Sequence, residues 1–470
     1  MDDSKDDEKP ANNIASIARF QSRKESGAKS AKDGRATRPE IVKLNEKHFV
    51  INNIGGNCMV GEFVESSIDD KCKVLSLQTA AAFKLRYGNE TVAVIYKKDG
   101  KEVRSYRELG AYWLKHPDRL NYEGIDLVPN GPKVLPGNRL NLWRGFGVVP
   151  KQGKYPLIRW HLDHVLANGD ERAALYIWNW TAWAVQHPDI PAEVALVFQG
   201  LKGIGKGVWA HKIRRIFGEH GLYINSPVHL VGNFNGHLEG CVLLFSDEAF
   251  AVTDKRSEST LKGLLTEPVL IVERKRIDAR QVKNMLHIIM VANHKWVVPA
   301  TGDERRFAVY AVSDVKRGDE AYFNALYDEI NNGGLEALLY DLLHTDLGDW
   351  HPRQIYETEA LRGQKVHSLS GEEEWLEDVL QQGVIPGRLD ERLDRATTRD
   401  LVDDARRRVP KLRYVSEIAF GNFLRDNGCV KWRSATAKGR QFPPLQEMRA
   451  AWEKRFGGWK WEEPELAEWQ

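Results

Sequence analysis

Short apolar runs alternate with helix-like segments along the middle of the chain. Uninterrupted apolar runs, typical of strands buried on both faces, occur in EVALVFQG, GCVLLFSDEAF, NMLHIIMVANH and RRFAVYAV. Between them lie segments with helical spacing, GKGVWAHKIRRIFG and RSESTLKGLLTE. This alternation predicts an α/β core over residues 191–320, in which a parallel sheet carries helices on both faces.

The pattern changes on the N-terminal side of this core. Residues 1–40 contain few large apolar side chains, so we expect a disordered tail there. Residues 41–150 mix strand and helix patterns, with a hairpin in TVAVIYKKDGKEVRSY that turns at Asp99-Gly100, and predict an α+β domain. Residues 151–190 carry helical periodicity and predict a helical collar.

The segments that follow the core predict a second small domain. Residues 321–365 have a helical pattern. Residues 366–470 predict helices followed by a basic hairpin and a last helix, the order of a winged-helix domain. Such a domain suits either duplex DNA or a protein partner, and the sequence favours neither. Its basic side chains are Arg425, Lys431, Arg433, Lys438 and Arg440.

Composition narrows the class of protein. The chain has 470 residues, of which 42% are hydrophobic and 29% charged, and these values predict a soluble protein of several domains. A net charge of only +2 means that any nucleic-acid site must be local. No apolar stretch has the length of a membrane span and no signal region opens the chain, so we expect a cytoplasmic protein without a membrane contact. The cysteines form no CxxC pair, and we expect no zinc site.

A glycine-rich loop follows the first buried strand. Residues 200–206, GLKGIGK, fit the pattern G-x-x-x-x-G-K between a strand and a helix. Backbone N–H groups of such a loop wrap phosphates, the helix N-terminus faces the same anion, and the lysine reaches the outer phosphates. The sequence therefore predicts an ATP site. The predicted contacts are Gly200, Gly203, Ile204, Gly205, Lys206, Gly207 and Val208.

The predicted magnesium site departs from the usual motif. Gly207 stands where a Ser or Thr hydroxyl normally holds Mg²⁺, so the ion must depend on carboxylates, phosphate oxygens and water. In CVLLFSDEA, an apolar run delivers Asp247 and Glu248 to the carboxyl end of a strand, where open parallel sheets bind ligands. We expect Asp247 to hold Mg²⁺, directly or through water, and Glu248 to polarise the attacking water.

Three further polar residues fit the same chemistry. Asn293 ends the third apolar strand, where its amide is placed to bind the γ-phosphate or to orient water. Arg305 and Arg306 precede the fourth strand, and a guanidinium that reaches a neighbouring subunit's site would stabilise transition-state charge. The alternatives are a turn-forming asparagine and a surface ion pair with Asp303 or Glu304.

The order of GLKGIGKG, LLFSDEA, STLKGLLTEPVLIVERKR, IIMVANH and DERRF resembles the superfamily 3 helicases. The similarity extends to the poxvirus-type primase-helicases and their phage and plasmid relatives, and it spans about residues 105–320. The resemblance implies an AAA+-related P-loop ATPase that assembles as a ring, in this case a homo-hexamer. It also implies movement along single-stranded DNA, usually in the 3′ to 5′ direction.

The same resemblance suggests a DNA contact. In that family a Lys-bearing hairpin, between the acidic strand and the asparagine, enters the ring channel. LIVERKRIDARQVK matches by position, which assigns DNA contacts to Arg274, Lys275 and Arg276, with Lys262 on the preceding helix as a weaker candidate. A cationic hairpin tip gives the sequence-independent backbone contacts that a motor needs. A solvated run of charges is the alternative.

Together these patterns predict a replicative DNA helicase of a phage, plasmid or mobile element. Its cofactors would be ATP and Mg²⁺, and its substrates single-stranded and forked DNA. No catalytic primase domain is recognisable, so we expect a primase or another replication protein to act in trans. Two other functions remain open. One is a nucleotide-gated ring that binds an origin or a partner with little unwinding, which Gly207 favours, and the other is an ATPase that remodels proteins.

Overall fold

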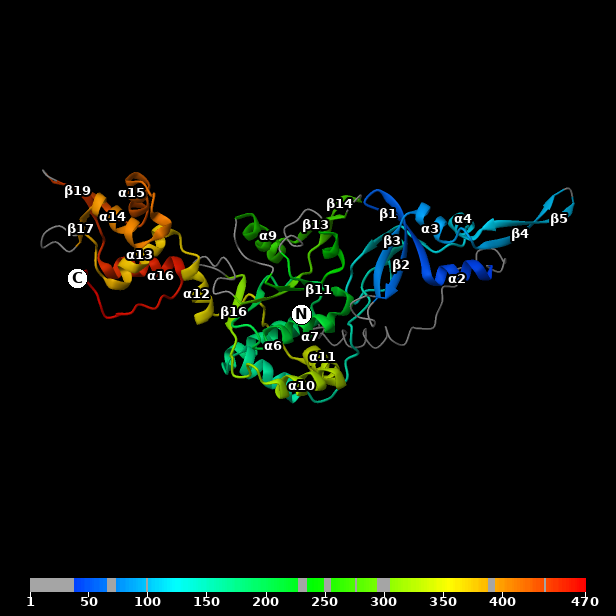
Figure 1. The fold of residues 1–470 in the computed structure, drawn as a ribbon, viewed down its shortest axis with the longest axis horizontal. Helices are drawn as coiled ribbons and strands as arrows, with labels where there is room; N and C mark the ends of the chain where they lie inside the picture. Colours follow the sequence, from blue (N-terminus) through cyan, green and yellow to red (C-terminus); the bar gives the residue numbers. More distant parts are fainter. Residues whose placement is uncertain are drawn as a thin grey trace, which may run out of the picture.

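The computed structural model shows an elongated molecule, in which a central body lies between an N-terminal and a C-terminal domain (Figure 1). The disordered tail predicted for residues 1–40 falls almost wholly outside the described residues. No helix in the described part of the chain is long and apolar enough to cross a membrane. The described residues are 38–65, 73–98, 100–226, 235–248, 255–274, 277–293, 305–387, 394–434 and 437–470.

The N-terminal domain is a mixed α/β unit. Its four-stranded sheet has the order β3-β2-β1-β6 and packs on three short helices around Phe83 and Trp113, both fully buried. A second, three-stranded sheet has the order β7-β9-β8. The strands are β1 (His48–Ile54), β2 (Asn57–Glu65), β3 (Lys73–Gln78), β6 (Asn121–Tyr122), β7 (Gly124–Asp126), β8 (Val134–Leu135) and β9 (Arg139–Asn141). The helices are α2 (Pro39–Lys47), α3 (Ala80–Arg86) and α4 (Leu109–Leu114).

The predicted hairpin of this domain is present. Strands β4 (Thr91–Lys98) and β5 (Lys101–Glu108) pair antiparallel with Lys98 opposite Lys101. The pair forms a separate two-stranded sheet that projects away from the rest of the domain (Figure 1). Asp99 of the predicted turn lies outside the described residues.

The central body is built on a five-stranded parallel sheet with the order β11-β12-β15-β10-β16. The four strands that the apolar runs predict are all present. Strand β11, which is short, was not predicted. The strands are β10 (Ala195–Gln199), β11 (Gly221–Ile224), β12 (Leu243–Asp247), β15 (His287–Ala292) and β16 (Phe307–Ala311). A hairpin of β13 (Val269–Arg274) and β14 (Ile277–Lys283) lies between β12 and β15 in the chain.

Helices cover both faces of this sheet, which explains the apolar runs. Alternate residues of each strand face opposite layers, so that Leu196 and Phe198 enter one core and Ala195 and Val197 the other. The first layer contains α5 (Pro156–Trp160), the π-helix η1 (His161–Leu166), α6 (Glu171–Gln186), α7 (Lys206–Phe217), α10 (Glu320–Glu329), the π-helix η4 (Ile330–Gly334) and α11 (Leu335–His344). The second layer contains α9 (Lys255–Thr266), the short helix η3 (Gly236–Gly240) and α12 (Glu359–His367).

The C-terminal domain is a small α+β unit with its own core around Trp375 and Phe420. Its sheet has the order β17-β19-β18. The elements are α13 (Gly371–Gln382), β17 (Arg395–Thr397), α14 (Thr398–Arg408), α15 (Glu417–Asp426), β18 (Val430–Arg433), β19 (Lys438–Gln441) and α16 (Leu445–Phe456). Arg440, predicted to belong to a basic surface, is instead buried and donates to the carbonyl of Gly421.

Three histidines of the central body are buried in the neutral state. Burial lowers the pKa of His161, His220 and His287 to about 4. A histidine in an unfolded chain titrates near 6.5, so between pH 6.5 and pH 4 the unfolded chain binds more protons than the folded one. The folded state must therefore lose stability as the pH falls through this window.

We predict that the free energy of unfolding falls by roughly 1.4 kcal/mol per pH unit for each of these histidines below about pH 6. Urea unfolding followed by tryptophan fluorescence at several pH values measures the slope. The variant His220→Gln removes one titrating ring and should reduce the slope by roughly 1.4 kcal/mol per pH unit. An unchanged slope in this variant would contradict the assignment and leave other titrating groups as the cause.

Candidate functional site

The glycine-rich loop joins β10 to α7 at the carboxyl edge of the parallel sheet. Strands β12 and β15 end at the same edge because all three run parallel, and β15 lies between β10 and β12. The polar residues that follow these strands therefore meet. A pocket of about 430 Å³ opens here, and its lining includes Lys206, Asp247, Glu248 and Asn293. The structure thus brings together four of the residues that the sequence assigned to one site.

The loop itself needs glycine for steric reasons. Gly203 and Gly205 have φ values of 80° and 94°, in the left-handed region that side chains disfavour. A Cβ atom on Gly205 would lie 2.6 Å from Cε1 of His161, closer than atoms can pack. Helix α7 begins at the next residue, so its free N–H groups face the pocket. Ile204, a predicted contact, is almost fully buried and does not line the pocket.

The ammonium of Lys206 lies at the centre of the site. Only 5% of this residue is exposed. Its Nζ donates to the carbonyl of Gly200 at 2.8 Å, to the carbonyl of Leu201, and to Oδ1 of Asn293 at 2.7 Å. Burial lowers the pKa of Lys206, and the nearby carboxylates of Asp247 and Glu248 oppose this shift. All three ammonium hydrogens therefore have acceptors within the protein.

Asn293 connects this cation to the acidic strand end. Its side-chain amide donates to Oε1 of Glu248 while its oxygen accepts from Lys206. Glu248 has a φ of 54° and its N–H donates to the carbonyl of Val291 at 2.9 Å, which turns its side chain toward β15. Asp247 accepts from the hydroxyl of Tyr223 at 3.3 Å. The two carboxylates thus occupy different positions, with only Glu248 held by the amide.

Several residues near the loop were not foreseen from the sequence. His161 of η1 is 1% exposed, and its Nε2 lies 3.2 Å from the carbonyl of Gly205. Because a carbonyl only accepts, Nε2 carries the proton and Nδ1 accepts from the Tyr322 hydroxyl at 2.9 Å. Phe323 and Tyr327 of α10 line the pocket. No motif marks these residues, since they are separated from the loop by 39 residues or more in the sequence.

The predicted arginine and lysine contacts lie elsewhere. Arg305 is exposed and Arg306 half-buried just before β16, and neither lines the pocket. The backbone carbonyl of Arg306 accepts from the N–H of Ala195 at 2.8 Å. Lys262 is half-buried on α9, also away from the pocket. A role for these residues therefore depends on a partner molecule.

The predicted hairpin, β13 with β14, is present, but its cations are not equivalent. Lys275 and Arg276 at the tip lie outside the described residues. Nη2 of Arg274 lies 2.7 Å from Oε2 of Glu239, and the guanidinium of Arg280 contacts the other carboxylate oxygen. The side chain of Glu239 is only 2% exposed. Arg274, which the sequence assigned to DNA, is thus engaged in holding the hairpin to η3.

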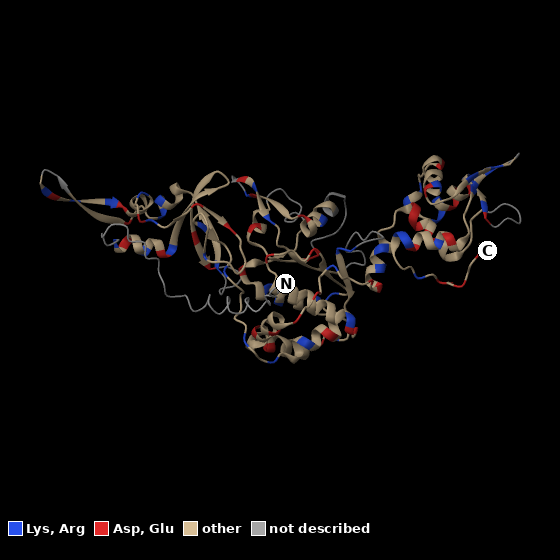
Figure 2. Cartoon of the chain, turned by 180° about the vertical axis from the view of Figure 1, so that it is seen from behind, with Lys and Arg blue, Asp and Glu red and all other residues tan. Residues whose placement is uncertain are grey.

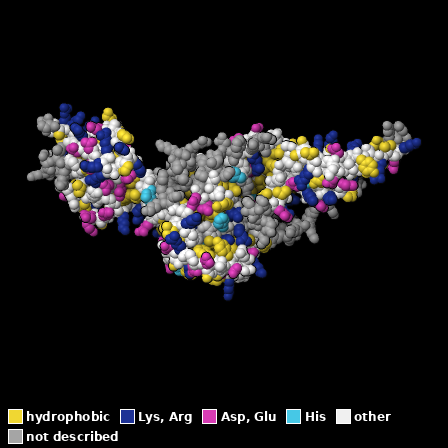
Figure 3. All heavy atoms as spheres, in the orientation of Figure 1, with side chains coloured by type: hydrophobic (Ala, Val, Ile, Leu, Met, Phe, Trp, Pro, Cys, Tyr) yellow, Lys and Arg dark blue, Asp and Glu magenta, His cyan; other side chains and the backbone are white. Residues whose placement is uncertain are grey.

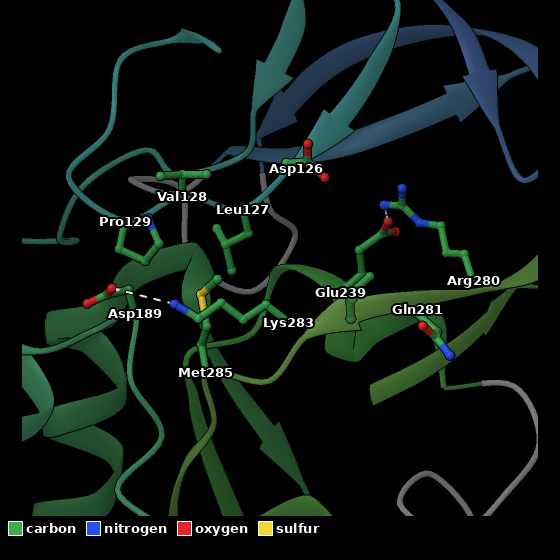
Figure 4. Close-up of a pocket in the computed structure, with 11 residues that line it drawn as sticks. Asp126, Leu127, Val128, Pro129, Asp189, Glu239, Arg280, Gln281, Lys283 and Met285 are labelled. Carbon is green, nitrogen blue, oxygen red and sulfur yellow. Dashed lines mark ion pairs between the residues drawn. The ribbon is translucent and has the colours of Figure 1, made fainter. Parts of the chain in front are cut away.

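A second pocket, of about 300 Å³, lies at the base of this hairpin (Figure 4). Nζ of Lys283 is 3.6 Å from a carboxylate oxygen of Asp189, and Nη1 of Arg280 is 3.5 Å from the carbonyl of Ile125. The opposite wall is formed by the segment after β7 of the N-terminal domain (Figure 4). The hairpin is therefore fastened both to the central body and to the N-terminal domain.

Carboxylates do not cluster at the site in the way of a dedicated metal centre. Among the residues that the structure describes, no group of three or more His, Cys, Asp or Glu side chains could hold a metal ion. A cation at the pocket would have Asp247 and Glu248 as its nearest acidic groups, and it would need further oxygen ligands from a bound phosphate and water.

Comparison with known proteins finds a family model that covers this site and a phage enzyme that resembles part of the chain. Residues 198–306, which contain the loop, the acidic strand end, the hairpin and Asn293, match a family of unknown function (DUF5906). Over 246 residues, 52% of this chain, the sequence is 26% identical to the DNA primase-polymerase of Nitratiruptor phage NrS-1. The chain matches only 33% of the length of that relative.

Solved structures of a region of the same phage protein resemble this chain in fold. The apo structure of the NrS-1 C-terminal region has a TM-score of 0.56 and 17% identity, over 84% of this chain and 88% of that one. Its A form apo structure has a TM-score of 0.59 and 17% identity, over 85% of this chain and 97% of that one. The chain shares the fold of the NrS-1 C-terminal region.

The carboxylate of Glu239 should determine how firmly the hairpin is held. Replacing it in Glu239→Gln removes the carboxylate that lies between the two guanidinium groups. We expect a cost of about 3 kcal/mol, at the low end for a broken buried pair because both arginines keep some exposure. This corresponds to a roughly 100-fold loss of hydrogen-exchange protection in β13 and β14.

Hydrogen exchange read by mass spectrometry measures this effect. The matched control is Glu273→Gln, which removes a half-buried carboxylate from β13 itself. Among the described residues, no ion pair joins Glu273 to another side chain. Equal protection of the hairpin in Glu239→Gln and the unaltered chain would show that the ion pairs do not anchor it.

Proposed function

We propose that this chain is an ATP-driven motor of the superfamily 3 type, with an AAA+-like P-loop core, that acts on DNA during the replication of a phage or mobile element. The observation that carries the proposal is the contact of Lys206 with Asn293, which joins the glycine-rich loop to the end of the neighbouring strand. Through Glu248 the same amide reaches the acidic strand end. Loop cation, polar amide and carboxylate are the groups that phosphoryl transfer to water requires.

The strand order supports this assignment. Numbered along the chain, the five parallel strands lie in the order 5-1-4-3-2 from β16 to β11. Strand β15 is thereby inserted between the strand before the loop and the strand before Asp247. A side chain at the end of an inserted strand can contact both neighbours, as Asn293 does. A ligand that spans loop and carboxylates would pass directly over this amide.

Each residue of the site would have its own role in binding and hydrolysing ATP. The loop N–H groups and the N-terminus of α7 would bind the β- and γ-phosphates, and phosphate oxygens would replace the carbonyls as acceptors for Lys206. Asp247 would hold Mg²⁺, which neutralises the charge that develops on the phosphates. Glu248 would accept a proton from the attacking water, with Asn293 fixing its position.

The DNA-directed part of the proposal rests on the resemblance and on the phage relative. The tip of the β13–β14 hairpin, with Lys275 and Arg276, would contact single-stranded DNA in the channel of a homo-hexamer, while Arg274 anchors the hairpin. Arg305 or Arg306 would reach the ATP site of the next subunit. Forked DNA would be the substrate for unwinding, and a primase would supply primers.

The C-terminal domain fits a winged helix, and its surface favours a protein partner over duplex DNA. The order α13, β17, α14, α15, β18 and β19 is that of a winged helix, in which α15 would be the recognition helix. Ile418 of α15 and Tyr414 before it are 79% and 87% exposed, and both are apolar or aromatic rather than cationic. A DNA-reading helix normally presents cations and amides to the phosphates and bases. On α15 the exposed Arg425 is paired with Asp426 and donates to the side chain of Asn422.

A second candidate function is a nucleotide-gated ring that binds DNA or a partner with little turnover. Gly207 favours it, because this position lacks the hydroxyl that normally holds Mg²⁺. Lack of room for a side chain does not explain the glycine at position 207. The nearest atom to an added Cβ would be Cδ2 of His211, at an ordinary contact distance of 3.7 Å.

The ATPase of the full chain tests the proposed function. We expect Lys206→Ala to lower DNA-stimulated ATP hydrolysis by about 100-fold or more and to weaken ATP binding, because it removes the cation that offsets phosphate charge. Glu248→Gln should keep ATP binding and lose hydrolysis. The control is Lys84→Ala, an exposed lysine of α3. Near-normal turnover in Lys206→Ala would overturn the proposal, and ATP binding without turnover in the unaltered chain would favour the second candidate.

The magnesium requirement tests the role of Gly207. We expect Gly207→Ser to be accommodated and to lower the Mg²⁺ concentration that gives half-maximal ATPase activity, because the hydroxyl adds a ligand. Gly207→Ala is the matched control, since it gains the same helix propensity without the oxygen. Identical Mg²⁺ titrations for the two variants would mean that this position does not face the ion.

A further inference from the structure

The β4–β5 arm, made of strands β4 and β5, is a second surface with a distinct chemistry. Its contacts with the rest of the N-terminal domain lie at its base, where Val92 is buried and α4 packs against both strands. The remainder projects away from the molecule (Figure 1). An isolated two-stranded hairpin is marginally stable in water, so a long projecting one indicates a binding partner.

One face of the arm combines apolar, aromatic and cationic side chains. Ala93 pairs with Tyr106 and Ile95 pairs with Arg104, and directly opposed residues share a face of the ribbon. Tyr106 is 63% exposed and Ile95 56% exposed. The guanidinium carbon of Arg104 lies 5.4 Å from the centre of the Tyr106 ring, which holds the two side chains together as one platform.

Further cations lie on the other face of the arm. Lys101 and Arg107 are exposed along β5, but they face away from Tyr106 and Arg104 because successive residues of a strand alternate between its two faces. No ion pair joins Lys101, Arg104 or Arg107 to an acidic side chain in the described ranges. Glu102 and Glu108, near the two ends of β5, share the face of Tyr106. Figure 2 shows basic segments at the tip and toward the base of the arm, and Figure 3 shows hydrophobic and basic side chains side by side on it.

A pocket at the base of the arm places further cations beside Arg107. It has a volume of about 320 Å³ and is lined by Arg107, Tyr112, Lys115 and His116 together with Ala111 and Pro117. No acidic residue is among its lining residues. An anion that enters it meets two permanent cations and an aromatic ring.

We propose that the β4–β5 arm and the pocket at its base bind single-stranded nucleic acid. Aromatic faces stack on unpaired bases of any sequence, and guanidinium and ammonium groups bind the phosphates between them. Tyr106 would stack on a base and Arg104 would bind the neighbouring phosphate, while Arg107 and Lys115 would bind phosphates where the strand passes round the ribbon to the pocket. Over the arm and its pocket together, the cations outnumber Glu102 and Glu108, which favours nucleic acid over a protein or a second copy of the chain.

Single strands fit better than duplex. A two-stranded ribbon can enter the major groove of duplex DNA, where polar side chains read base edges. Here the exposed residues beside the cations are Tyr106 and Ile95, which have little to bind on base edges but can cover the faces of unstacked bases. This site goes beyond the proposed motor, whose DNA contact is the separate β13–β14 hairpin.

Binding of a fluorescent oligothymidylate to the full chain, measured by anisotropy without nucleotide, tests the proposal. We expect Tyr106→Ala to weaken binding at least about fivefold, the effect of losing one base stack, and Tyr106→Trp to retain it. Arg104→Ala should reduce the salt dependence by about 0.7 in logarithmic slope, the share of one phosphate. Lys43→Ala, an exposed lysine of α2 in the same domain, is the charge-matched control and should leave the slope unchanged.

Cross-linking locates the contact independently of the motor. Single strands that carry 5-iodouracil should cross-link to peptides of β5, and this signal should disappear in Tyr106→Ala. Cross-links confined to other segments, or unchanged affinity in both arm variants, would overturn the proposal. So would a loss of duplex binding alone, or a change in self-association without any change in DNA binding. The ATPase measured without DNA should be the same in the arm variants, so that a failed motor and a failed arm are told apart.

Discussion

The arrangement of the site depends on the need to satisfy one buried ammonium. A charged amine cannot be removed from water unless each of its hydrogens finds an acceptor. For Lys206 these acceptors are two loop carbonyls and the side chain of Asn293. The first two belong to the segment after β10 and the third to the end of β15, so a single side chain fixes the loop against the neighbouring strand. Glu248 is then positioned by the same amide.

This arrangement is possible only because the sheet brings three strand ends to one edge in the right order. Strands β10, β15 and β12 are consecutive neighbours, each buried on both faces by helical layers. Such strands cannot slip in register without exposing apolar side chains. From the other side, His161 donates to the carbonyl of Gly205, which fixes its tautomer, and its other ring nitrogen accepts from the hydroxyl of Tyr322. Packing of the cores thus sets the distances between the polar groups.

The sequence predicted the features that local patterns encode and missed those that depend on distant partners. Buried parallel strands appear as apolar runs, so four strands and the polar residues that follow them were foreseen, while the short β11 (Gly221–Ile224) was not. Arg274 was assigned to DNA by its position in the family resemblance, and nothing local reveals that Glu239, 35 residues earlier, is buried beside it. His161 was missed because a lone histidine in a helical segment has no motif, and Arg440 because burial of its guanidinium depends on Gly421.

The hairpin and the site share one mechanical element. Glu239 belongs to η3 (Gly236–Gly240), which leads directly into β12, and Asp247 is the last residue of that strand. Strand β12 is hydrogen-bonded on both sides, by β11 and β15, so it moves as a unit rather than bending. Asp247 and Glu239 are therefore joined through one strand, and the ion pairs of Glu239 with Arg274 and Arg280 join that strand to the base of the hairpin. Since Arg280 also contacts Ile125, the N-terminal domain is connected to the same set of contacts.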